Sequence, residues 1–172
     1  YASPDNTILR AVNVIRDRIY TGCYAEFGYW KKNRLGLLEY TSLMPKLDVK
    51  MPEDEQVWNI IAYKEWVVFQ SNNTIYFYNS ETETFKIISS PNTIYKIFKV
   101  KNSIYYHVAN EGIYGIENGQ PKLVINDAIA KTERIINLFE SKQGLLVLTR
   151  HSGFYKFETG KMQRWEIPAD AT

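Results

Sequence analysis

The feature that most constrains the fold of this chain is an internal repeat. In four segments a small residue or glycine is followed by Ile, Phe or Tyr and then by Tyr or Trp. The middle residues of these motifs are separated by 46, 38 and 41 residues; they are Tyr29, Ile75, Ile113 and Phe154. A repeat of about 40 to 45 residues is typical of the four-stranded blade of a β-propeller.

Within each repeat, β-branched and aromatic residues gather in short runs bounded by turn residues, which predicts strands. Apolar side chains occupy both alternating faces of these runs, as at Ile75 to Tyr78. Because a sheet with one wet face alternates apolar with polar residues, this pattern favours stacked sheets. We therefore predict an all-β fold, a single β-propeller segment over residues 1–172. It comprises four consecutive four-stranded antiparallel blades at about residues 11–43, 57–89, 94–126 and 134–167. The helical pattern at 127–134 is interpreted as a short connector.

Composition excludes several classes of function. Lys and Arg number 21 against 19 Asp and Glu, a net charge of +2, which gives no basic field of the kind that attracts nucleic-acid phosphates. No apolar run reaches the roughly 18 residues that a membrane helix needs. We expect neither nucleic-acid binding nor membrane insertion by this segment. The lone Cys23 excludes a disulfide framework and is predicted to be a small buried residue.

The sequence contains no signature of a serine hydrolase, a phosphate-binding loop, a zinc protease or a cysteine pair. We therefore predict no catalytic residues, no cofactor and no metal site. His107 lies in an apolar strand and is expected to be a hydrogen-bonded structural residue. The acidic residues 53–55 are expected to be solvated, and most large rings to fill the space between blades: Trp58, Trp66, Tyr76, Tyr114, Tyr155 and Trp165.

Several stretches resemble a known family. They are residues 26–30 (Glu-Phe-Gly-Tyr-Trp), residues 36–43 (Gly-Leu-Leu-Glu-Tyr-Thr-Ser-Leu), residues 57–60 (Val-Trp-Asn-Ile) and the motifs at 112–114 and 153–155. Together they resemble the regulator propellers of bacterial hybrid two-component kinases and of triple-tyrosine helix-turn-helix transcriptional regulators. The resemblance implies a periplasmic domain of an inner-membrane protein, followed by an immunoglobulin-like module, a membrane helix and a kinase or DNA-binding output. It also implies a propeller of about seven blades, of which four lie here.

The function that this resemblance implies is that of an extracytoplasmic input domain, which senses a ligand or partner for a membrane-spanning signalling protein. Two alternatives stay open. One is a propeller-type carbohydrate-active enzyme, a lyase or a glycosidase, for which Glu26 and Glu111 are the visible carboxylates. The other is a purely structural module for interaction or dimerisation.

The loops between second and third strands of propeller blades gather at one end, so residues distant in sequence converge there. We predict a site for a small molecule or glycan in these loops, formed by Tyr24, Glu26, Asn72, Asn110, Glu111, Arg150 and His151. We also expect the terminal blades to expose apolar faces, which are covered by self-association or by the remaining blades of the same protein.

Overall fold

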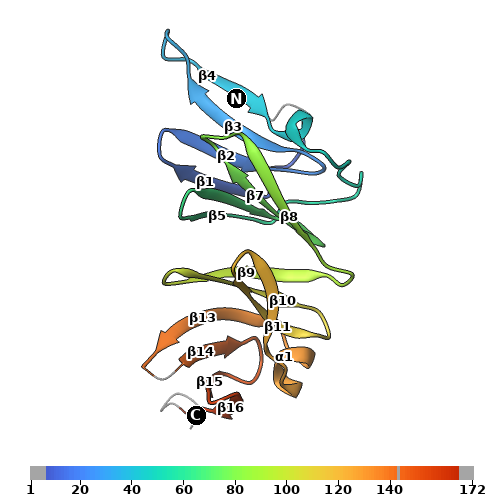
Figure 1. The fold of residues 1–172 in the computed structure, drawn as a ribbon, viewed down its shortest axis with the longest axis vertical. Coiled ribbons are helices and arrows are strands. Elements are labelled where there is room, and N and C mark those ends of the chain that lie inside the picture. The colour runs from blue at the N-terminus through green and yellow to red at the C-terminus, as the bar shows by residue number, and fades with distance from the viewer. Residues whose placement is uncertain (1–6, 143, 167–172) are drawn as a thin grey trace. The chain divides into compact units, whose positions relative to one another are not determined.

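The computed structural model describes residues 7–142 and 144–166 and contains four antiparallel four-stranded sheets in chain order (Figure 1). Residues 1–6 and 167–172, at the two ends of the predicted segment, lie outside the described residues. In each sheet every strand pairs with its neighbour in sequence. The prediction of an all-β fold with four consecutive antiparallel blades is confirmed.

The first two sheets are blades 1 and 2. Blade 1 contains β1 (Ala11–Ile15), β2 (Arg18–Gly22), β3 (Phe27–Lys32) and β4 (Leu38–Ser42), and a 3-10 turn η1 (Met44–Lys46) follows it. Blade 2 contains β5 (Asn59–Tyr63), β6 (Trp66–Gln70), β7 (Thr74–Asn79) and β8 (Thr84–Ser89).

The other two sheets are blades 3 and 4. Blade 3 contains β9 (Ile94–Val100), β10 (Ser103–Val108), β11 (Gly112–Glu117) and β12 (Gln120–Ile125). The helix α1 (Ala128–Thr132) is the short connector predicted at this place. Blade 4 contains β13 (Ile135–Ser141), β14 (Gly144–Thr149), β15 (Phe154–Glu158) and β16 (Lys161–Arg164).

The strand register corrects one detail of the repeat alignment. Near the end of the second strand, Gln70 pairs with Ile75 in blade 2, His107 pairs with Ile113 in blade 3, and Leu148 pairs with Phe154 in blade 4. In blade 1 the corresponding partner is Phe27, which pairs with Gly22. Tyr29 lies in β3, as predicted, but two residues beyond the equivalent position. Gly28 precedes Tyr29 just as glycines precede Ile113 and Phe154. This similarity in sequence gave an alignment of blade 1 that differs by two residues from the strand register.

The chain divides into two compact units, Tyr1–Ser89 and Ser90–Thr172. In the first unit, β1 and β5 lie side by side (Figure 1), and the side-chain amide of Asn13 donates to the carbonyl of Ile60 at 2.8 Å. Aromatic rings fill the space between blades 1 and 2. Phe27 is fully buried, with its ring centroid 4.5 Å from that of Phe69 and 5.2 Å from that of Tyr76. Burial of such rings dominates the hydrophobic contribution to this core.

The long connection from blade 1 to blade 2 contributes to the same core. Leu43 is fully buried and Met51 is 4% exposed, and both pack into the cluster that contains Phe27. Met44 and Leu47 lie partly buried against it. The apolar residues of this connection, in and next to η1, therefore pack against the core that blades 1 and 2 share.

In the second unit, His107 joins blade 3 to the connector and to blade 4. Its Nε2 lies 2.7 Å from the carbonyl oxygen of Ala130 in α1, and its Nδ1 accepts from the backbone N–H of Ile135 at 3.3 Å. Because a carbonyl only accepts, Nε2 carries the proton and the ring is neutral. The prediction of a hydrogen-bonded strand histidine is confirmed, as is the burial of Cys23, which is 1% exposed.

Candidate functional site

A short antiparallel ladder outside the main sheets brings the second-to-third-strand loop of blade 1 beside the end of the long connection. Tyr24 forms a backbone bridge with Gln56. The N–H of Ala25 donates to the carbonyl of Glu55 at 2.8 Å, and that of Val57 donates to the carbonyl of Cys23 at 3.0 Å. Since side chains alternate along such a ladder, one set faces the core and the other faces outward.

The alternation is visible in the burial of the residues. Cys23, Glu55 and Val57 are between 0% and 5% exposed, whereas Tyr24 is 43% and Trp58 41% exposed. The indole N–H of Trp58 donates to the Oδ1 of Asn72 at 2.5 Å, and the guanidinium carbon of Arg10 lies 5.2 Å from the centroid of the indole ring. We call this surface the Trp58 face; it consists of Arg10, Tyr24, Gln56, Trp58 and Asn72.

The Trp58 face combines groups that suit a polar ligand with an apolar side. The indole and phenol rings offer flat apolar contact, while the guanidinium and the two amides offer hydrogen bonds. Within the part of the chain that the structure describes, Arg10 makes no ion pair. The Oε1 of Gln56 is buried beneath this surface and accepts no hydrogen bond there. A small number of polar groups that converge around an aromatic surface is typical of small-molecule sites.

Glu55 lies directly beneath this surface. Its side chain accepts from the hydroxyl of Ser71 and from the backbone N–H of Asn73, the latter at 3.1 Å. The carboxylate thereby holds the turn that carries Asn72. The expectation that residues 53–55 are all solvated is wrong for Glu55, which is 5% exposed, and it holds for Glu53 and Asp54, which are exposed.

We expect Glu55→Ala to lower the free energy of unfolding by about 1–3 kcal/mol, because it leaves buried donors of the turn without an acceptor. Asp54→Ala is the matched control, with an expected change within about 0.5 kcal/mol because its side chain is exposed. Urea unfolding of both variants measures the difference. Equal stability of the two variants would show that the carboxylate of Glu55 does not hold the turn.

Three predicted site residues belong to the first unit. Tyr24 and Asn72 lie on the Trp58 face. Glu26 turns elsewhere: its carboxylate accepts from the hydroxyl of Tyr40 at 2.8 Å and from that of Ser42 at 2.9 Å. These bonds tie the loop before β3 to β4.

The other four predicted residues belong to the second unit, in the corresponding turns of blades 3 and 4. Asn110 is exposed in a left-handed conformation with φ of 62°. Next to it, Glu111 accepts from the side-chain amide of Asn92 at 2.7 Å and from the hydroxyl of Tyr114. The bond with Tyr114, and then that with Asn92, lowers the pKa of Glu111, and the carboxylate raises the pKa of Tyr114 to about 12.

Arg150 and His151 are exposed on the turn of blade 4. The N–H of His151 donates to Oε2 of Glu133 at 3.1 Å, and the hydroxyl of Ser152 donates to the same carboxylate. Burial raises the pKa of Glu133, but the hydrogen bonds from Ser152 and the backbone outweigh it and leave the pKa lowered. Glu133 thus holds its turn as Glu55 does. That the residues of both units form one site stays a prediction.

Arg10, Gln56 and Trp58 were not predicted from the sequence as site residues. Trp58 and Trp165 were expected in the core, but they are 41% and 39% exposed, whereas Tyr76 and Tyr155 are buried as expected. The strand predicted to begin at residue 57 begins at Asn59, because residues 55–57 pair with the loop of blade 1. One signal in the sequence could have shown that Trp58 is exposed. In an extended chain neighbouring side chains point to opposite sides, so a buried Val57 places Trp58 on the outer side.

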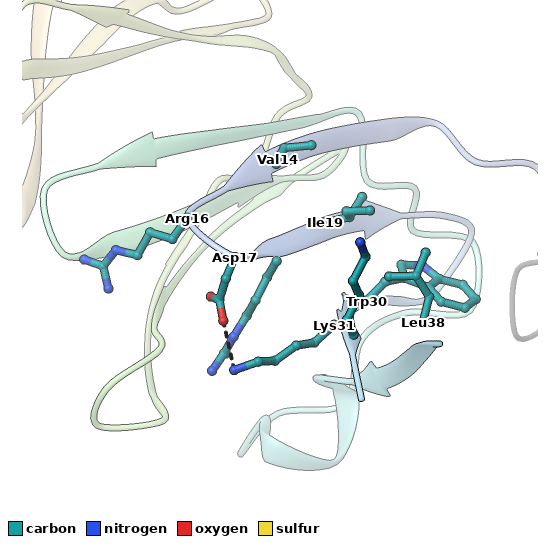
Figure 2. Close-up of a pocket in the computed structure, with 9 residues that line it drawn as sticks. Val14, Arg16, Asp17, Ile19, Trp30, Lys31 and Leu38 are labelled. Carbon is teal, nitrogen blue, oxygen red and sulfur yellow. Dashed lines mark ion pairs between the residues drawn. The ribbon is translucent and has the colours of Figure 1, made fainter. Parts of the chain in front are cut away.

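A hollow of about 360 Å³ lies on the face of blade 1 that points away from blade 2 (Figure 2). Val14, Ile19, Trp30 and Leu38 line it, and charged residues flank it, among them the ion pair of Asp17 and Lys31 at 2.9 Å. The described residues contain no group of three or more His, Cys, Asp or Glu side chains placed to hold a metal ion. The described residues also include no helical segment with the length and hydropathy of a transmembrane span.

No protein-family model matches this chain, and no curated protein matches it in sequence. Solved structures do match its fold. The extracellular domain of the one-component system BT4673 from B. thetaiotaomicron has a TM-score of 0.67 and 18% identity, over 95% of this chain and 23% of that chain. The WD40 domain of Neurospora crassa Pan2 has a TM-score of 0.64 and 12% identity, over 94% of this chain and 51% of that chain. Citrobacter koseri AztD has a TM-score of 0.62 and 12% identity, over 91% of this chain and 46% of that chain.

These similarities show the fold. The chain consists of consecutive propeller-type blades and spans about a quarter to a half of the length of these solved structures. A second structure of the BT4673 extracellular domain, there assigned to a hybrid two-component system, matches with 17% identity and the same TM-score of 0.67.

Proposed function

We propose that this chain is part of the extracytoplasmic, periplasmic input domain of a bacterial membrane-spanning signalling protein, and that the Trp58 face binds its ligand. The observation that carries the proposal is the ladder of residues 23–25 and 55–57, which presents Tyr24 and Trp58 outward beside Asn72 and Arg10. The motif resemblance to regulator propellers and the fold similarity to the BT4673 extracellular domain support the assignment to signalling.

The ligand that fits these groups is a small molecule or glycan with an apolar side and several hydroxyl or carboxylate groups. An aromatic ring packs against the C–H side of a sugar, while amide and guanidinium groups bond its oxygens. The indole N–H already donates to Oδ1 of Asn72, so the Nδ2 of Asn72 is the group left to donate to a ligand.

The proposal gives no catalytic role to Glu26 or Glu111. Each carboxylate accepts hydrogen bonds from side chains of its own compact unit, and the two residues belong to different units. No observation favours the alternative of a glycosidase or lyase.

We expect Trp58→Ala to weaken ligand binding roughly tenfold or more, because it removes the ring on which the ligand stacks. Binding is measured on an array of neutral and acidic oligosaccharides, and output with a reporter in the intact signalling protein. The stability of the variant should change by less than about 1 kcal/mol, since the ring is partly exposed.

Leu123→Ala is the control, because Leu123 is an apolar residue of blade 3 with a similar exposure of 38%. It should bind and signal as the wild type does. Equal binding by the Trp58→Ala variant would exclude the Trp58 face as the site. A wild-type protein that binds no glycan would exclude this class of ligand and leave the small-molecule form of the proposal to be tested by the reporter.

A further inference from the structure

Arg18, the first residue of β2, is a cation that makes no ion pair within the described residues. Its guanidinium carbon lies 4.3 Å from the centroid of the Tyr29 ring, and its Nη1 is buried without a hydrogen-bond partner. A guanidinium stays charged, and its N–H groups only donate. Because a buried charge is costly unless it is compensated, a negatively charged acceptor beside Nη1 would stabilise the folded chain.

The carboxylates around Arg18 are already engaged by other cations. Three ion pairs account for them: Arg16 with Glu81 at 3.2 Å, Lys31 with Asp17 at 2.9 Å and Lys46 with Glu83 at 2.6 Å. The hydrogen bond from Lys31 is the main cause that lowers the pKa of Asp17, and the charge of Arg18 is a minor one. The same order holds for Lys46 and Arg18 at Glu83. The charge of Arg18 is therefore left without a carboxylate of its own.

A second buried polar atom without a partner belongs to blade 2. The side chain of Tyr78 in β7 is 0% exposed, and its hydroxyl is buried without a hydrogen bond. Burial is the main cause that raises the pKa of Tyr78, so the hydroxyl keeps its proton and is able to donate. The charges of Arg18 and Lys46 act on the same pKa in the opposite direction, which brings both cations within electrostatic reach of this hydroxyl.

Tyr20 links Arg18 to the end of β7. Burial raises the pKa of Tyr20, while the charge of Arg18 and hydrogen bonds of the Tyr20 hydroxyl with Arg18 and Ser80 oppose the rise. Ser80 follows Tyr78 by two residues, and Tyr20 and Tyr78 belong to one buried cluster. The Arg18 side chain thus reaches from blade 1 to the part of blade 2 that holds Tyr78.

We propose that a small monovalent anion, chloride in ordinary salt solutions, binds between blades 1 and 2 and accepts hydrogen bonds from Nη1 of Arg18 and from the hydroxyl of Tyr78. An anion suits this site better than water does, because it balances the charge of Arg18 and brings no hydrogens that need acceptors of their own. A single-atom ion also suits the tightly packed core in which both donors are buried. This site is separate from the Trp58 face and does not depend on the proposed function.

The test compares urea unfolding in sodium chloride with unfolding in sodium gluconate at the same ionic strength. The wild type should unfold at a higher urea concentration in chloride, by about 1 M once chloride exceeds its dissociation constant 100-fold. Bromide should replace chloride in this effect. In crystals grown with bromide, anomalous scattering should show one ion between Arg18 and Tyr78.

Two variants each remove one donor. Tyr78→Phe and Arg18→Met should reduce the shift between gluconate and chloride to less than about a quarter of its wild-type size. Tyr76→Phe is the control for the first, because Tyr76 is also buried in β7 but has hydrogen bonds with Thr74 and Ser71. Arg16→Met is the control for the second, because Arg16 is exposed and pairs with Glu81. Both controls should retain the full shift.

Equal urea midpoints of the wild type in chloride and gluconate would overturn the proposal and leave water as the occupant of the site. A full shift retained in the Tyr78→Phe protein would overturn it as well, because chloride would then act at another place. Tyr78→Phe decides the matter alone if Arg18→Met does not fold, since it removes only a hydroxyl group and keeps the ring.

Discussion

Replacing Phe27 by alanine is expected to lower the free energy of unfolding by about 3–5 kcal/mol, the largest effect of any single substitution considered for this chain. The ring is fully buried, and the rings of Phe69, Tyr76 and Phe85 surround it at centroid distances of 4.5, 5.2 and 6.1 Å. Alanine would leave a cavity between two sheets whose backbones are fixed by strand pairing, so the site is unable to collapse around the smaller residue.

Urea unfolding followed by circular dichroism measures this loss. Tyr24→Ala is a suitable control, since Tyr24 lies in the loop just before Phe27 but is 43% exposed. Its expected cost is below about 1 kcal/mol. A loss of that small size for Phe27→Ala would mean that blades 1 and 2 do not share the packed core described above.

The second large effect concerns pH. Burial lowers the pKa of His107 below its ordinary value of 6.5, and the nearby Arg134 guanidinium acts in the same direction, while the hydrogen bond to the Ala130 carbonyl opposes it. The folded protein therefore binds fewer protons than the unfolded chain at mildly acidic pH. Stability is fully present above about pH 7 and falls as the pH drops through 6.5, with a slope approaching about 1.4 kcal/mol per pH unit.

Protonation of His107 would remove the acceptor for the N–H of Ile135 and place a buried cation near Arg134. His107→Gln should abolish most of the slope between pH 7 and 5, because an amide donates and accepts at the same places without titrating. His151→Gln should retain the slope, since that imidazole is exposed. Urea midpoints across this pH range provide the test; an unchanged slope in the His107→Gln protein would contradict the explanation.

The strands were predictable because blades impose a simple pattern on the sequence. A strand such as β7 is apolar on both faces, since it lies inside a stack, and its ends coincide with the turn residues around 72–73 and 79–80. The repeat of this pattern fixes the number of sheets. Register was less predictable in blade 1, where Gly28 shifted the apparent alignment by two residues.

The candidate site was predictable only in part. Tyr24 and Asn72 follow from the rule that the loops at one end of the blades gather. Arg10 and Trp58 do not, because their contact depends on the pairing of residues 23–25 with residues 55–57, which are far apart in sequence and carry no strand-like pattern. Glu55 is a similar case: only the fold shows that one of three adjacent acids points inward.

The two glutamates that hold turns, one in each compact unit, have a consequence for how the exposed residues of those turns can vary. Glu55 accepts hydrogen bonds from the hydroxyl of Ser71 and the backbone N–H of Asn73. Glu133 accepts from the backbone N–H groups of His151 and Ser152 and from the hydroxyl of Ser152. The shape of each turn is therefore set from below and does not depend on the exposed side chains of Asn72, Arg150 or His151. Substitution at these positions changes the chemistry that each turn exposes while the backbone of the turn stays constant, so these side chains can vary between related proteins without a loss of stability.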